Sequence, residues 1–199
     1  MPTPTEPAPA GARRRDALRN EAQIVAAAMR LLADDPEATM QDVADAAGLG
    51  RATVYRHFPT REALTAAIGR AAVAEVGAVL SASRLDEGDP IEALARAIDA
   101  IFAVGDRYRV IIHAPPAVKD PDACDKAEAV GPMAALIERA QREGALAAGP
   151  PAEWILAAVG AVIVAAFQQL ATGGIPRAEA PRMVMDTILG GFGAPRATA

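Results

Sequence analysis

The residues of this chain best able to do chemistry stand together between Arg51 and Phe58. The stretch reads RATVYRHF and holds two arginines, a threonine, a tyrosine and one of the two histidines of the chain. Elsewhere the chain is mostly aliphatic, since hydrophobic residues make up 52% of it and aromatic residues only 4%. Guanidinium, hydroxyl and imidazole groups can donate hydrogen bonds to phosphate oxygens and to base edges. The stretch therefore indicates a binding surface, and nucleic acid is a partner that suits it.

Two short helices joined by a glycine turn are predicted to position these residues. Thr39 stands before a helical stretch and Asp42 follows three residues later, which is close to a capping box. Gly48 ends that helix, and a second helix is predicted over 51–58. Thr60 is then a predicted N-cap for the next helix. This is the sequence pattern of a helix-turn-helix, whose second helix enters the major groove of DNA.

Helical spacing gives the second of these helices an apolar side and a polar side. Val54 and Phe58 lie four residues apart and are expected to pack on Ala44, a small residue suited to the point where the two helices cross. The other residues form pairs one turn apart on the polar side: Arg51 with Tyr55, Ala52 with Arg56, and Thr53 with His57. The predicted face is cationic and aromatic, as a DNA-reading surface requires.

The charge of the chain is acidic overall but its basic residues are clustered. The net charge is −5, which by itself argues weakly against nucleic acid binding. The first 60 residues hold 7 basic against 8 acidic side chains, and the rest hold 13 against 17, so most of the excess acid lies in the second part. Arg13, Arg14, Arg15 and Arg19 form a separate basic cluster. That cluster is either a solvated end or an arm that reaches phosphates or the minor groove, and the sequence leaves both open.

The string TMQDVADAAGLGRATVYRHFPTREAL resembles the DNA-binding segment of the tetracycline-repressor (TetR) family of bacterial regulators, and the resemblance covers about residues 16–65. It implies base contacts from Gln41, Arg51, Ala52, Thr53 and Arg56. It also implies phosphate contacts from Thr39, Tyr55, His57 and Arg61. Gly50 stands where many members of the family have serine, so a hydroxyl cap or phosphate contact is missing there.

The predicted fold is all-helical, with an N-terminal three-helix DNA-binding domain and a C-terminal helical domain for ligand binding and dimerisation, as the resemblance implies. About nine helices are expected, over about 16–33, 40–48, 51–58, 61–83, 90–105, 108–113, 123–146, 150–174 and 179–193. The domain boundaries follow from these: a disordered tail over 1–12, the DNA-binding domain over 13–60 and the second domain over 61–199.

The second domain is expected to bind a small-molecule effector and a second copy of the chain. Candidate ligand-pocket residues, chosen by position, are Phe102, Tyr108, His113 and Met133, although for His113 alone we favour a packed or partly exposed histidine. Sparse charge in the central helices suggests an apolar effector. The resemblance implies a four-helix dimer interface from the last two long helices, with candidates Trp154, Ile155, Val159, Val162, Phe167, Met183, Val184 and Ile188, alongside Ile163 and Leu189.

The long uncharged stretch over 154–176 has a competing interpretation as a membrane span. We favour a packed and paired helix, because much of the stretch is alanine and glycine and Gln168 and Gln169 interrupt it. No targeting segment is recognised, and a single cysteine, Cys124, cannot form an internal disulfide, so a cytoplasmic location is expected.

Enzyme chemistry has little support in the sequence. One cysteine and two histidines cannot build the usual zinc sites, and GLGRAT follows a predicted helix rather than a strand. No catalytic residue, metal or cofactor is predicted. The sequence therefore indicates a homodimeric, ligand-responsive repressor that binds a palindromic operator in double-stranded DNA. The alternative is a small-molecule-binding or interaction module of the same fold that does not bind an operator.

Overall fold

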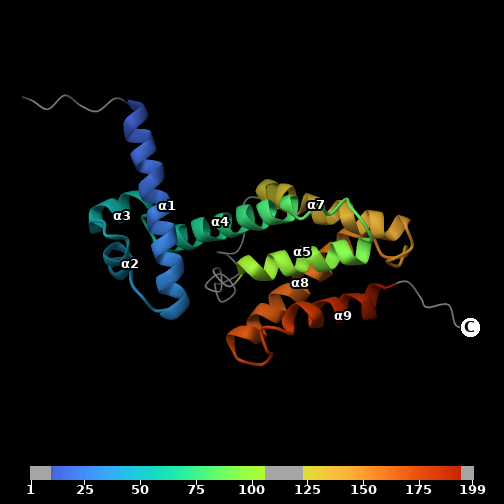
Figure 1. Ribbon diagram of the computed structural model, residues 1–199. Helices are drawn as coiled ribbons and strands as arrows, with labels where there is room; N and C mark the ends of the chain where they lie inside the picture. Colours follow the sequence, from blue (N-terminus) through green and yellow to red (C-terminus); the bar gives the residue numbers. More distant parts are fainter. Residues whose placement is uncertain (1–9, 106–122, 194–199) are drawn as a thin grey trace, which may run out of the picture. The chain divides into compact units, whose positions relative to one another are not determined.

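The computed structural model describes residues 10–105 and 123–193, and this part of the chain contains eight helices and no β-strand (Figure 1). The all-helical prediction is confirmed, as an alanine-rich chain with few aromatic residues favours. The chain divides into two compact units, Met1–Ala67 and Ile68–Ala199. The predicted helix over 108–113 lies outside the described residues.

The first unit consists of α1 (Ala10–Asp34), α2 (Met40–Ala47), α3 (Arg51–His57) and the start of α4 (Arg61–Ala82). The start of α1 lies before the predicted start near Asp16, so Ala10–Ala12, which we assigned to the tail, are helical. Alanine and arginine are strong helix formers, which accounts for the earlier start. Helix α2 contacts both α1 and α3.

The ends of α2 are fixed as the sequence predicts. The Thr39 hydroxyl accepts a hydrogen bond from the Asp42 amide, and the Asp42 carboxylate accepts one from the Thr39 amide, which completes the capping box. Gly48 ends the helix with a left-handed φ of 64°, a conformation that glycine adopts without strain. Helix α3 begins after Gly50, which supplies no side-chain cap.

The core of the first unit is small and mostly aliphatic. Val54 is fully buried on α3, and Ala44 is fully buried on α2 at the predicted crossing position. Their buried neighbours in this unit include Ile24, Ala28, Leu32, Val43, Phe58 and Leu64. Val54 is the one buried residue of α3, and four of its seven residues are exposed and available to a partner: Arg51, Ala52, Tyr55 and Arg56.

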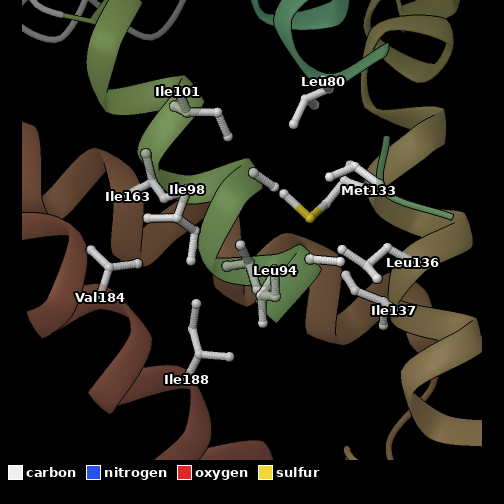
Figure 2. Close-up of a cluster of buried hydrophobic side chains, with 14 of the residues drawn as sticks. Leu80, Leu94, Ile98, Ile101, Met133, Leu136, Ile137, Ile163, Val184 and Ile188 are labelled. Atoms are coloured by element: carbon white, nitrogen blue, oxygen red, sulfur yellow. The ribbon is translucent and has the colours of Figure 1, made fainter. Parts of the chain in front are cut away.

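The second unit is built on α5 (Pro90–Gly105), α7 (Ala123–Arg142), α8 (Ala152–Ala171) and α9 (Ala180–Phe192). Both α5 and α8 contact α7 and α9, so the four helices surround a common core. Figure 2 shows part of that core, where Met133 points from α7 toward the side chains of α5. The buried cluster contains only apolar residues.

The loop after α4 is held by two arginines of the second unit. Arg96 donates hydrogen bonds to the carbonyl oxygens of Arg84 and Glu87, at 3.2 and 2.9 Å. Arg139 donates to those of Leu85 and Gly88, at 3.0 and 2.9 Å. The end of α4 is thus tied to α5 and α7 by side chains distant in sequence.

Helices α4 and α8 are each long and apolar enough to cross a membrane, a property that core helices of soluble proteins share. In the most apolar 18-residue stretch of α8, only 28% is buried inside the protein. Its buried side chains recur at helical spacing, at Ile155, Val159, Ile163 and Phe167. The opposite side of α8 is therefore both apolar and exposed.

Candidate nucleic-acid interface

Helix α3 presents the predicted polar face to the outside. Arg51, Ala52 and Arg56 are exposed, and the Tyr55 side chain is 37% exposed. Thr53 and His57 are half-buried at the edges of this face. The face stands on Val54 and Phe58, which anchor the helix in the core. One helix thus combines a buried anchor with exposed hydrogen-bond donors.

Arg51 and Tyr55 interact along α3. The guanidinium carbon of Arg51 lies 5.2 Å from the centre of the Tyr55 ring, within the range of a cation–π contact. The two residues are one helical turn apart, so the contact follows from the backbone geometry. Stacking restricts the arginine side chain while its N–H groups stay exposed for a partner.

The α2 candidates have partners within their own helix region. The Gln41 amide donates to a carboxylate oxygen of Asp45 at 2.9 Å. The Thr39 hydroxyl and amide both donate to the Asp42 carboxylate, each at 2.7 Å. These bonds, led by the one from the Thr39 side chain, lower the pKa of Asp42. The Thr39 donors are therefore directed at Asp42, and the phosphate contact of the exposed Thr39 stays a prediction.

Arg61 makes contacts that the sequence did not predict. Its side chain reaches back from the first residue of α4 to the loop before α2. One terminal nitrogen donates to the carbonyl oxygen of Ala38 and the other to that of Pro36. Sequence reasoning missed this because the partners lie 23 and 25 residues away.

The basic cluster before the helix-turn-helix lies in α1. Arg15 and Arg19 are exposed and one helical turn apart. For Arg13 and Arg14 only the helical backbone is described. A flexible arm is therefore the wrong description of these four residues, since all of them belong to a helix.

Two of the four ligand candidates of the second unit lie in the described residues. Met133 and Phe102 are buried in the apolar core, and Phe102 stacks on Phe167 with ring centres 4.6 Å apart. Both side chains belong to the core, and their contact with a ligand stays a prediction. Tyr108 and His113 lie outside the described residues.

A groove of about 430 Å³ lies instead between α4 and α7. It is lined by Arg70, Val73, Ala74, Gly77, Ala78, Ser81, Glu128 and Ala129. A Cβ added to Gly77 would lie 3.0 Å from the Cα of Ala129, so a small residue is needed where the two helices approach. The run of small residues on α4 was the sequence signal for this groove, but small residues also suit ordinary helix packing.

The dimer candidates separate into two groups. Most are buried in the core of their own unit, which removes them from any interface: Ile155, Val159, Phe167, Val184 and Ile188. Val162 is half-buried, whereas Trp154 is 63% and Met183 39% exposed. Val164, which we did not predict, is 44% exposed on the same helix as Trp154.

A capped helix, a glycine turn and a second helix with an exposed cationic face define a helix-turn-helix DNA-binding protein. Residues 24–68 match the model of the family described as bacterial regulatory proteins, tetR family. This part of the chain is similar to the DNA-binding domain of that family, and the chain is a DNA-binding transcriptional regulator, as the sequence predicts. Regulators of this kind are not enzymes, which agrees with the absence of a predicted catalytic site.

Known proteins resemble the chain over most of its length. It is 28% identical over 174 residues to the transcriptional repressor LfrR of Mycolicibacterium smegmatis, a match that covers 87% of this chain and 90% of LfrR. The crystal structure of LfrR in complex with proflavine has a TM-score of 0.71 at 27% identity, covering 87% of this chain and 96% of that one. PfmR from Thermus thermophilus shares the fold, with a TM-score of 0.64 at 22% identity, over 84% of this chain and 97% of PfmR.

Proposed function

We propose that the chain is a repressor that binds a palindromic operator as a homodimer and responds to a small molecule. The observation that carries this proposal is α3, whose exposed cationic face stands on the buried Val54. The likeness to the repressor LfrR supports repression as the mode of regulation. The DNA-binding domain is proposed to end near Thr60 and the effector domain to begin with α4.

The exposed side chains of α3 have distinct proposed roles. Arg51 and Arg56 would donate to guanine, while Ala52 and Thr53 would contact a thymine methyl group or a base edge. Tyr55 and His57 would donate to phosphate oxygens, and Gln41 would reach a base from α2. The cation–π contact with Tyr55 would pre-organise Arg51 for its base.

Dimerisation is proposed through the exposed sides of α8 and α9. Helix α8 exposes Trp154 and Val164 together with the small residues Ala157 and Ala161, and α9 exposes Met183. An exposed apolar surface of this kind marks an interaction site, and a second copy of the chain covers it in a symmetric way. This would account for the composition of α8 without a membrane, in a protein that meets DNA in the cytoplasm.

The effector is proposed to bind in the second unit, and we assign it to the groove between α4 and α7. Its wall combines aliphatic side chains with Arg70 and Glu128, so an effector with an apolar body and a polar group would suit it. Proflavine is the first ligand to test, because LfrR was crystallised with it. Binding should be measured by fluorescence anisotropy without DNA, with Ala78→Trp as the variant that fills the groove, since Ala78 lines it at an exposed position.

The test of DNA binding starts by selecting bound sequences from random duplexes with the full chain. A palindromic consensus with half-sites about one helical turn apart is expected. Arg56→Ala should then lower the affinity for that duplex by about tenfold to a hundredfold. The matched control is Arg142→Ala, which removes the same charge from an exposed position on α7. If no sequence is selected and the affinity for DNA does not fall with salt, the alternative is favoured, namely a module of the same fold that does not bind an operator.

The test of the dimer places a charge on the proposed interface. Ala161→Glu on α8 should convert the protein to a monomer in sedimentation equilibrium and weaken operator binding. Ala82→Glu makes the same change at an exposed position of α4 and should stay dimeric. A monomeric wild-type protein would reject this part of the proposal.

A further inference from the structure

Arg61 holds the loop that leads into α2. Both terminal nitrogens of its guanidinium donate hydrogen bonds, one to the carbonyl oxygen of Ala38 and one to that of Pro36. The side chain is half-buried. A rigid, planar fork of donors can bind two carbonyl groups at once, which restricts their relative positions.

The two carbonyl groups lie in the loop that leads directly into the first turn of α2. Ala38 is buried and directly precedes Thr39, the N-cap of α2. The hydrogen bonds inside the loop use other acceptors, because the Ala38 amide donates to the Asp35 carbonyl and the Glu37 amide donates to the Asp35 side chain. Arg61 therefore supplies a link from α4 that the loop does not provide for itself.

We infer that Arg61 is a positioning residue that fixes the entry of α2 to the first turn of α4 and thereby sets the placement of the helix-turn-helix for its operator. The inference rests on the proposed operator binding. Arg61 acts through the backbone of Pro36 and Ala38 and not through a phosphate. Helix α3 is affected because it contacts α2 and follows it after the Gly48 turn.

The same chemistry fixes the other end of α4. Arg96 and Arg139 bind carbonyl groups of the loop after this helix, as Arg61 binds those of the loop before α2. Each end of α4 is thus tied by guanidinium groups to the unit in which it lies.

The test compares Arg61→Lys with Arg61→Ala on the selected operator at several salt concentrations. Lysine keeps the positive charge but lacks the fork, so it cannot replace a two-carbonyl contact. Both variants should lose affinity about tenfold, with a salt dependence equal to that of the wild type. Arg56→Ala in the same series shows what the loss of a DNA-facing cation does to the salt dependence.

A second measurement uses a duplex that lacks the operator. Misplaced recognition helices lose base contacts while phosphate attraction remains, so both Arg61 variants should lose specific affinity and retain non-specific affinity. Hydrogen exchange at the amides of residues 37–42 should be faster in both variants. If Arg61→Ala does not fold, the lysine variant alone still decides between the two roles.

Three results are distinguishable. Wild-type affinity in Arg61→Lys, together with a slope of log K against log salt that is about 0.9 smaller in magnitude in Arg61→Ala, would show a phosphate contact and overturn the inference. Loss of specific affinity in both variants with an unchanged slope supports it. Failure of the wild type to bind any duplex would reject the proposed function itself.

Discussion

The two units of the chain differ in what their exposed surfaces are made of. The first unit exposes cationic and polar side chains on α3, above a small core that includes Val54 and Ala44. The second has a large apolar core and also exposes apolar residues on α8, including Trp154 and Val164. The first surface is defined by the identity of single residues, and the second by shape and apolar character.

The units also differ in what holds them together. In the first, capping and side-chain hydrogen bonds fix short helices, as with Thr39, Asp42 and Arg61. In the second, long helices bury aliphatic side chains against one another. A short helix buries too little apolar surface to fix its own position, so polar contacts decide its orientation.

The largest expected effect is a cavity in the core of the second unit. Ile98 is fully buried in the cluster between α5, α7, α8 and α9 (Figure 2). Ile98→Ala should lower the free energy of unfolding by about 2–5 kcal/mol, measured by urea denaturation. Leu18→Ala removes an aliphatic side chain that is 59% exposed, so it should change the free energy of unfolding by less than about 0.5 kcal/mol. If the two variants lose equal stability, Ile98 does not lie in a dense core.

Excess volume in that core should have a smaller effect. A Cβ added at Gly105 would lie 2.0 Å from the ring of Phe167, which is buried and stacked on Phe102. Gly105→Ala should therefore lower the melting temperature, with a cost of about 1–3 kcal/mol. A Cβ at Gly69, inside α4, meets no atom within 4 Å, so Gly69→Ala should stabilise the protein by about 0.5–1 kcal/mol. If Gly105→Ala and Gly69→Ala shift the melting temperature in the same direction, the space around each glycine does not explain the effect of the added methyl group.

Loss of the N-cap of α2 should lower the stability of the protein by less than the two core substitutions do. Thr39→Ala removes the hydroxyl that accepts from the Asp42 amide and should cost about 1 kcal/mol. Thr187→Ala is the control, because that hydroxyl bonds only to a carbonyl inside α9, at 2.8 Å from Met183. Thermal denaturation followed by circular dichroism measures both. A neutral Thr39→Ala would show that capping does not hold the first unit.

The smallest expected effect depends on pH. Hydrogen bonds from Thr39 lower the pKa of Asp42 in the folded state, so its carboxylate stabilises the fold above the unfolded pKa. That contribution is lost as the pH falls below roughly 4 and through the folded-state pKa. The difference in stability between the wild type and Asp42→Asn should therefore be present near neutral pH and shrink in acid. A difference that stays constant across this range would exclude the titration of Asp42 as its source.

Sequence reasoning succeeded best in the first unit. The predicted cap at Thr39, the glycine turn at Gly48 and the burial of Val54 are all present. Each depends on neighbours within a few residues, so the local pattern contains the necessary information. The role of Arg61 does not, because its partners lie in a loop more than twenty residues earlier.

In the second unit the sequence predicted helices but not the use of their side chains. Phe102 and Met133, which were predicted for a pocket, are buried in the core, and most dimer candidates are buried in their own unit. The groove on α4 and the exposed Val164 were not predicted. Aliphatic residues serve a core, a groove or an interface equally well, because the hydrophobic effect has no direction.

The sequence by itself determined the all-helical class, the capped helix-turn-helix and the cationic face of α3, since helix formation and capping depend on residues close along the chain. Only the tertiary structure decided which side of α8 is covered, where the groove lies and which carbonyl groups Arg61 binds. Those outcomes depend on how helices pack, and the same apolar spacing is compatible with several packings until the neighbours of each helix are known.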